Sequence, residues 1–390
     1  MFDFNTNEGY FLHLLKCGLK SEKPEEPPVG IDFEAIFELA KKQDVENIVF
    51  LSIDQLENNI DSNLYSIWQE AYYKRMKYSA FQDMALEELI EVFTKAGIDC
   101  MPLKGSVIKN YYPSPDLRFM GDMDFHVREQ NRQVVRDIMH SLGYIDDILD
   151  DGQVDGFKRE KLVYVEIHYD FSDVNHAYHN LFTIDWDKLV STDIEHLYKM
   201  TIEDLYYFNV GHYAKNMQSR GMGIRAAIDC YVLWNEMNDE QRQNVLRMFL
   251  TTELKKFNDS LLKIAEIWFD GIMDHSLDTV QQYLLNTKTY SSKKDEITMY
   301  AVKDNLDDSN VKYVMRKIFP YPNELYKRFN IKHKCFVLLP FLWFYRICLQ
   351  VFGNEKKWDK AKEQLDNFKL VSNDDIEYQI QIRREFGLME

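Results

Sequence analysis

The spacing of apolar residues changes within 81–200 of this 390-residue chain, and that change limits the folds open to it. Segment 162–171 alternates between apolar and other residues, which places Tyr164, Glu166 and His168 on one face of a strand. Other stretches of the same region have the spacing of amphipathic helices instead. Strands that take turns with helices predict a small α/β unit.

The remaining strands and helices of this unit are predicted from shorter apolar patterns. Each predicted element is short and has a glycine or proline near one end. Strands are predicted at 98–103 and 123–127, and helices at 86–93, 106–112 and 134–142. The order of elements is therefore helix, strand, helix, strand, helix and strand.

Helical spacing dominates on both sides of the unit. Residues 33–40 have apolar positions on one helical face, and a further helix is predicted from 224 to 234. Thr201 begins a capping pattern that predicts a helix through about residue 216. The short apolar stretch 47–53 fits a helix or a strand, and periodicity does not decide between them.

The chain is therefore predicted to be an α+β protein in three parts. They are an N-terminal helical region at 1–80, the α/β domain at 81–200 and a C-terminal helical domain at 201–390. Hydrophobic residues make up 45% of the sequence, which is enough to bury a sizeable core and argues against a disordered chain.

The charge balance restricts the partners of the protein. Forty-seven basic and 64 acidic residues give a net charge of −17. A surface this acidic repels the phosphate backbone, which argues against general nucleic-acid binding. An anionic substrate must instead be held by a local cluster of cations or by metal ions.

Cysteine usage and apolar stretches indicate where the chain resides. The five cysteines form no C-x-x-C pair and read as buried, reduced thiols, and no signal-peptide pattern is visible, so we expect a cytoplasmic protein. The apolar segment 335–352 falls short of the ~20 residues that a membrane span needs. We expect it to be a helix buried against the C-terminal bundle, and an interfacial membrane helix is the alternative.

The residues that carry chemistry lie within 101–127. Gly105 and Ser106 follow a predicted strand and open a predicted helix, an arrangement that favours phosphate binding through backbone N–H groups. Asp122 and Asp124 are separated by one residue at the start of the next strand, so their carboxylates project from one face. Two adjacent carboxylates repel each other unless a cation lies between them, and oxygen ligands suit Mg²⁺.

Glu166 adds a third carboxylate on a neighbouring strand. Three carboxylates with two Mg²⁺ ions make a two-metal site for phosphoryl or nucleotidyl transfer. The alternative is that Asp122 and Asp124 belong to a solvated turn. A zinc site built from His168, His176 and His179 is not favoured, because it has no cysteine partner and poor ligand spacing.

Several motifs of the chain occur together and in this order. They are L-K-G at 103–105, Y-P-x-P-x-x-R at 112–118, D-x-D at 122–124, E-I-H-Y at 166–169, and H-Y-x-K at 212–215 followed by Arg225 and Asp229. The set resembles the signature of the uncharacterised nucleotidyltransferase family of bacteria, within the DNA polymerase β-like nucleotidyltransferase superfamily. The resemblance implies a mixed sheet flanked by helices, with catalytic and metal-binding roles for Asp122, Asp124 and Glu166.

Nucleotide binding is expected from residues around these carboxylates. The expected residues are Lys104, Gly105, Ser106, Arg118, His212 and Lys215. Arg118 could clamp a phosphate or brace the carboxylates. His212 and Lys215 share one helix face, and the alternative to triphosphate binding is a buried polar network in which Arg225 and Asp229 form an ordinary helix ion pair.

Two functions remain open at this point. The first is a Mg²⁺-dependent nucleotidyltransferase that moves a nucleoside monophosphate from an NTP to a hydroxyl of an unknown acceptor, whether small molecule, saccharide or protein. The second is a non-catalytic nucleotide-binding or partner-binding accessory protein that retains the nucleotidyltransferase fold. Three intact carboxylates favour the enzyme.

Overall fold

The computed structural model describes most of the chain up to residue 287 and parts of the remainder. The described residues are 2–56, 60–149, 153–159, 163–171, 184–219, 221–287, 298–299, 302, 319, 322, 325–326, 329, 331, 336–351 and 371–389. The chain forms two compact units. Unit 1 comprises 1–215, 222–289 and 386–388, and unit 2 comprises 216–221, 290–385 and 389–390.

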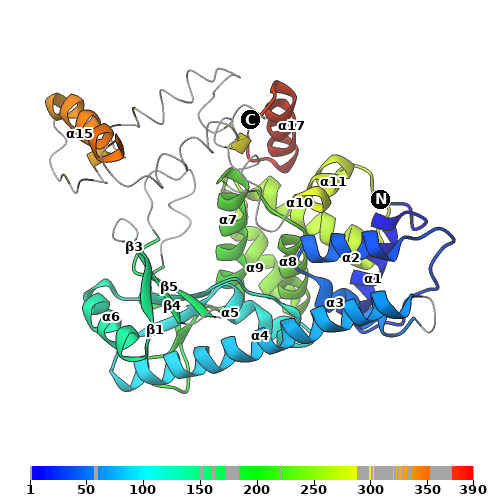
Figure 1. Cartoon of the computed structure of the whole chain (residues 1–390), viewed down its shortest axis with the longest axis horizontal. Helices are drawn as coiled ribbons and strands as arrows, with labels where there is room; N and C mark the ends of the chain where they lie inside the picture. The colour runs from blue at the N-terminus through cyan, green and yellow to red at the C-terminus, as the bar shows by residue number, and fades with distance from the viewer. Residues whose placement is uncertain are drawn as a thin grey trace. The chain divides into compact units, whose positions relative to one another are not determined.

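The first helices form part of unit 1 (Figure 1). They are α1 (Asn7–Lys20), α2 (Phe33–Lys42), α3 (Glu46–Ile53) and α4 (Ser62–Lys95). The helix predicted at 33–40 is confirmed as α2, and the undecided stretch 47–53 is helical. The side chains of Thr6, Asp32 and Asp61 cap α1, α2 and α4 by accepting hydrogen bonds from backbone N–H groups of the first turn.

Helix α4 joins the N-terminal helices to the sheet (Figure 1). It has 34 residues and is therefore about 50 Å long. One end contacts α3 and the other contacts the first strand and the middle of the sheet. The predicted helix at 86–93 thus lies within the C-terminal third of a much longer helix, which also spans the predicted boundary at residue 80.

The predicted mixed sheet flanked by helices is confirmed. Its strands are β1 (Cys100–Leu103), β2 (Met123–Val127), β3 (Ile145–Leu149), β4 (Val154–Arg159) and β5 (Val163–His168), in the spatial order β1-β2-β5-β4-β3. Only the β2–β5 pair is parallel, and the other three pairs are antiparallel. Helices α5 (Gly105–Ile108) and α6 (Arg132–Ser141) connect strands of the sheet.

One face of the sheet builds the core of unit 1. Phe125 of β2 is fully buried and meets Phe93 of α4 edge to face, with ring centroids 5.7 Å apart. Val165 and Ile167 of β5 join the same cluster, together with residues of α6. Because side chains alternate along a strand, the residues between them point to the opposite face, where the candidate site lies.

The hairpin of β3 and β4 was not predicted from the sequence. Its residues are rich in aspartate, which is uncommon in strands. Asp155 of β4 is fully buried and is held by Arg132 of α6, whose Nε lies 3.0 Å from a carboxylate oxygen. Arg136 lies 3.4 Å from the same carboxylate. Two cations from a separate helix thus offset the cost of burying this strand carboxylate.

The helices after the sheet complete both units. Unit 1 contains the pair β6 (Val190–Ser191) and β7 (Tyr198–Lys199) and most of α7 (Ile202–Ser219), followed by α8 (Arg225–Glu236), α9 (Asp239–Phe249), α10 (Lys255–Ala265) and α11 (Asp278–Asn286). The helices predicted from 201 and from 224 are confirmed. The Thr201 hydroxyl accepts a hydrogen bond from the Asp204 N–H, as its capping role requires.

Helices from the two ends of unit 1 are joined by one buried glutamine. The Gln43 amide donates to the carbonyl oxygens of Leu284, Leu285 and Thr287 at 2.8–3.0 Å. Its side-chain oxygen accepts from the N–H of Ile224 at 3.1 Å. The C-terminal ends of α2 and α11 and the start of α8 are therefore held together.

Unit 2 corrects one expectation. The helix predicted at 335–352 forms as a short 3₁₀ turn, Phe336–Leu338, and α15 (Leu339–Val351), but many of the side chains described there are exposed and not buried. Leu339 is buried against Leu325 and Tyr326. The large apolar side chains that stay exposed are Phe336, Val337, Leu338, Phe341, Phe344 and Tyr345. Among the side chains that the structure describes in this segment, the small cluster therefore covers only part of the apolar surface.

Two further expectations can be compared with the described residues. Cys17, Cys100 and Cys230 are buried free thiols, as predicted, whereas the side chains of Cys335 and Cys348 lie outside the described part. Unit 2 also contains α17 (Asn373–Phe386) up to residue 385. Among the helices that the structure describes, none combines the length and apolar character needed to cross a bilayer.

The sheet core makes a direct stability prediction. We expect Phe125→Ala to lower the free energy of unfolding by about 3–5 kcal/mol, because it removes a buried ring and leaves a cavity beside Phe93. Urea denaturation followed by circular dichroism measures the change. Met84→Ala is the control on α4, since Met84 is 67% exposed. Equal effects of the two substitutions would contradict this placement of the core.

Candidate functional site

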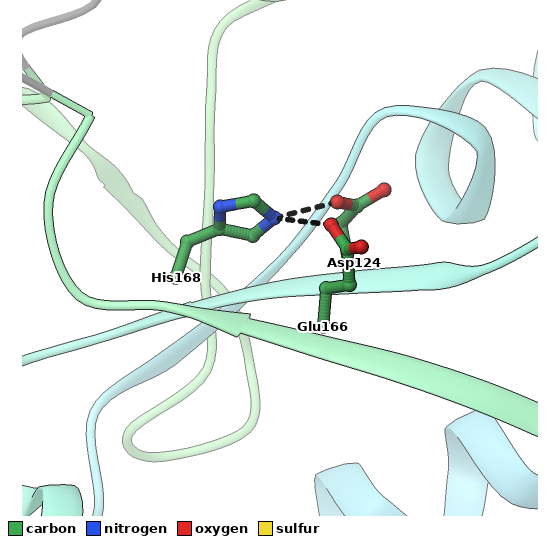
Figure 2. A group of neighbouring side chains, drawn as sticks. All are labelled: Asp124, Glu166 and His168. Atoms are coloured by element: carbon green, nitrogen blue, oxygen red, sulfur yellow. Dashed lines mark hydrogen bonds and ion pairs between the residues drawn. The ribbon is translucent and has the colours of Figure 1, made fainter. Parts of the chain in front are cut away.

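The parallel pairing of β2 with β5 brings polar side chains of the two strands together on one face of the sheet. Asp124 is paired with Glu166, and His126 is paired with His168 two residues further on. The side chains of Asp124, Glu166 and His168 each offer one ligand atom, and these three atoms lie within 4.8 Å of one another. Figure 2 shows the imidazole directed at both carboxylates.

The contacts within this group are short. Nε2 of His168 lies 2.7 Å from Oδ1 of Asp124 and 3.5 Å from Oε2 of Glu166. The Asp124 and His168 side chains are only 3% and 9% exposed, whereas that of Glu166 is 28% exposed. Glu166 is therefore the member of the group that an outside molecule can reach most directly.

Lys104 supplies a cation to the same carboxylate. Its Nζ donates a hydrogen bond to Oδ1 of Asp124 at 2.5 Å. Lys104 follows β1, whose last residue is paired with Asp124, and it adopts φ 48° and ψ −123°. This conformation is unfavourable for a residue with a side chain and costs about 1–3 kcal/mol. The buried ion pair with Asp124 helps to hold Lys104 in place.

The charges of the group shift its pKa values in opposite directions. Burial and the neighbouring Asp124 carboxylate raise the pKa of Asp122 to about 6, and Glu166 adds to the effect. Burial alone would also raise the pKa of Asp124, but the Lys104 charge and the His168 hydrogen bond hold it below its usual value. Asp122 is thus close enough to feel the other carboxylates, although it is not one of the three clustered ligands.

The turn after β1 needs glycine at position 105, because a side chain there would collide with its neighbours. A Cβ atom on Gly105 would lie 2.5 Å from Nη1 of Arg118 and 2.8 Å from Cγ of Met120. Ser106 is buried, and within the described part of the chain its hydroxyl has no hydrogen-bond partner. The predicted helix at 106–112 is shorter than expected, with one turn of α-helix followed by a 3₁₀ turn, Lys109–Tyr111.

Arg118 is held by a buried carboxylate on α8. Its Nε and Nη2 donate to the two oxygens of Asp229 at 3.0 and 2.8 Å. Asp229 is fully buried and also accepts hydrogen bonds from the hydroxyls of Tyr112 and Tyr213. The structure thus places Arg118 as a brace between α8 and the Gly105 turn.

His212 of α7 lies close enough to Asp124 to feel its charge, and Lys215 of the same helix acts on His212. Burial lowers the pKa of His212 well below its usual value, and the Lys104 charge lowers it further. The Asp124 carboxylate opposes this shift, while Lys215 adds to it. The charges of Lys104 and Asp124 therefore act on His212 of α7.

The described contacts exclude one alternative from the sequence and leave another untested. The helix ion pair of Arg225 with Asp229 is wrong, because Arg225 lies 3.3 Å from Asp44 and Asp229 binds Arg118. Of the candidate zinc ligands, His176 and His179 lie outside the described residues.

His168 is the residue that the sequence-based site set lacks. The signal was present, because strand alternation places His168 on the same face as Glu166. Alternation within β5 does not reveal which strand pairs with it. The sequence therefore could not show that β2 places an Asp124 oxygen 2.7 Å from the His168 imidazole.

The donor set fits a divalent cation. Two carboxylates and an imidazole nitrogen on adjacent strands form a compact set of ligand atoms. Asp122 adds a third carboxylate or carboxyl group close by. The unpaired Ser106 hydroxyl is the kind of buried polar group whose cost a bound phosphate would offset.

Comparison with known proteins gives one match. A model of the family described as uncharacterised nucleotidyltransferase matches residues 30–270. No curated protein and no solved structure matches the chain. The matched segment contains α2 to α10 and every residue of the candidate site.

Asp229 gives a test of the brace. We expect Asp229→Asn to lower the free energy of unfolding by about 3–5 kcal/mol, because it leaves the buried Arg118 charge without its partner. Asp239→Asn is the matched control, since the Asp239 side chain is fully exposed and a solvated ion pair such as that with Arg242 contributes little to stability. Thermal and urea unfolding measure both. A loss of stability for Asp229→Asn that is as small as that for Asp239→Asn would show that the brace is dispensable.

Proposed function

The chain belongs to the uncharacterised nucleotidyltransferase family, and on that premise we propose that it transfers a nucleoside monophosphate from an NTP to a hydroxyl group. The acceptor is a small molecule, a saccharide or a protein side chain. The observation that carries the proposal is the group of Asp124, Glu166 and His168 on adjacent strands, with Asp122 beside it. The resemblance to the DNA polymerase β-like superfamily implies metal-binding and catalytic roles for Asp122, Asp124 and Glu166, and a cytoplasmic location accompanies the proposal.

The carboxylates hold the metal in this proposal. Asp122, Asp124 and Glu166 would bind two divalent cations, Mg²⁺ being the first candidate. When bound, such ions lower the pKa of an attacking hydroxyl and offset charge on the leaving pyrophosphate. Glu166 is the most exposed of the clustered side chains, so it meets the acceptor hydroxyl and accepts its proton.

The cations around the carboxylates hold the triphosphate. A net charge of −17 opposes an approaching NTP, so local positive charge is needed. Lys104 lies at the carboxylates and supplies this charge. On α7, His212 is electrostatically coupled to Lys104 and also to Lys215, which carries the second positive charge of the proposal. The Lys104 ammonium would leave Asp124 for the phosphates when a metal ion takes its place. Arg118 acts indirectly, by fixing the turn that carries Gly105 and Ser106.

One observation favours the non-catalytic alternative. The Lys104 ammonium and the His168 imidazole both contact the same Asp124 oxygen, Oδ1, which already offsets its charge. A chain in which Lys104 permanently replaced the metal would keep the fold and lose transfer. Such a protein would bind a nucleotide or a partner without turnover.

The test is calorimetric titration with ATP, GTP, CTP and UTP, with and without Mg²⁺. We expect Asp124→Asn to weaken Mg²⁺-dependent NTP binding by about tenfold or more, because it removes a charged ligand worth ~1–3 kcal/mol. Asp239→Asn, a fully exposed site, should leave binding unchanged. NTP binding that depends on neither Mg²⁺ nor Asp124 would refute the proposal. Labelling of an acceptor in cell extract by α-labelled NTP distinguishes the enzyme from the non-catalytic binding protein.

The lysines provide a second test. We expect Lys104→Ala and Lys215→Ala each to lower NTP affinity by ~1–3 kcal/mol through the loss of a charge-assisted hydrogen bond. Lys95→Ala is the control, because Lys95 is 72% exposed at the end of α4. Unchanged NTP affinity of the Lys215→Ala variant would remove α7 from the nucleotide site.

A further inference from the structure

We propose that His168 is a metal ligand, and that the ion between β2 and β5 is therefore a first-row transition metal, with Mn²⁺ as its probe. The inference rests on the proposed function, since it concerns one of the two ions of that site. The other position, at Asp122 and Asp124, has oxygen donors alone and keeps Mg²⁺.

The spacing of the three donors fits one shared ion. Two ligand atoms at right angles on a cation about 2.1 Å away lie about 3.0 Å apart. Nε2 of His168 lies 2.7 Å from the nearer Asp124 oxygen and 3.5 Å from the nearer Glu166 oxygen. Small movements of side chains therefore suffice for all three atoms to ligate the same ion.

The imidazole is held with Nε2 directed at the carboxylates (Figure 2). Its ring stacks on Phe171 with centroids 4.8 Å apart and an interplanar angle of 16°. The carbonyl oxygen of His168 lies 3.0 Å from Nδ1 of His126, which joins the backbone of β5 to β2 at this point. A ring fixed in this way loses little freedom on binding an ion, which favours a ligand role.

The donor types decide the metal. Mg²⁺ prefers oxygen ligands and gives up its water reluctantly, so an imidazole nitrogen adds little to its binding. Imidazole suits transition metals, while carboxylates suit Mn²⁺ as well as Mg²⁺. A site of two carboxylates and one imidazole therefore binds Mn²⁺ better than Mg²⁺.

The experiment titrates the full chain with Mn²⁺ and with Mg²⁺ in the absence of NTP. We expect the wild type to bind Mn²⁺ at least about tenfold more tightly than Mg²⁺, and His168→Gln to lose most of that preference. Glutamine keeps an amide N–H that can donate to Asp124, so a purely structural role for His168 would leave the preference intact. His140→Gln, an exposed site on α6, is the control.

Electron spin echo measurements on the Mn²⁺-loaded wild type need no variant. Coupling of the bound Mn²⁺ to a nitrogen nucleus supports the inference, and its absence overturns it. Equal Mn²⁺ and Mg²⁺ affinities, or no binding of either ion, also overturn it. Nitrogen-coupled Mn²⁺ with no NTP binding would leave the inference standing and refute the proposed function, so the two failures are distinguishable.

Discussion

The contact of Lys104 with Asp124 is the interaction on which the site depends. Parallel pairing of β2 and β5 places Asp124 opposite Glu166, with Asp122 close by, so negative charges are brought together on a buried face. Such an arrangement is stable only if cations accompany it. The Lys104 ammonium does this at 2.5 Å, and His168 lies against the same oxygen. A bound metal ion would take over the same electrostatic task.

A helix outside the sheet helps to hold Lys104 in position indirectly, through Arg118. Asp229 on α8 binds Arg118, and Arg118 lies against the backbone of Gly105 one residue after Lys104. A buried network in unit 1 thus fixes the turn that carries the lysine. Because Asp229 is fully buried, its charge is fully committed to Arg118 and the two tyrosines. Of the residues that the sequence grouped as nucleotide ligands, Lys104 contacts a site carboxylate and Arg118 binds Asp229 instead.

The sequence predicted the elements whose apolar pattern is regular. Strand β5, helix α2 and the helices after residue 201 follow from alternation or helical spacing. The hairpin of β3 and β4 could not be predicted, because Asp155 depends on Arg132 and Arg136 of another element. For the same reason, sequence spacing paired Asp229 with Arg225, whereas the fold brings Arg118 to it. Side-chain partners that lie far apart in the sequence are set by tertiary packing, which periodicity does not contain.

A crystal of the full chain soaked with Mn²⁺ and a non-hydrolysable NTP analogue would show whether a metal ion replaces Lys104 at Asp124. We predict anomalous density for an ion within about 2.2 Å of an Asp124 carboxylate oxygen. We also predict that the Lys104 ammonium has moved from Asp124 to a phosphate oxygen. An Asp124 carboxylate still bound to Lys104, with the ion and the nucleotide elsewhere, would show that Asp124 is not a metal ligand.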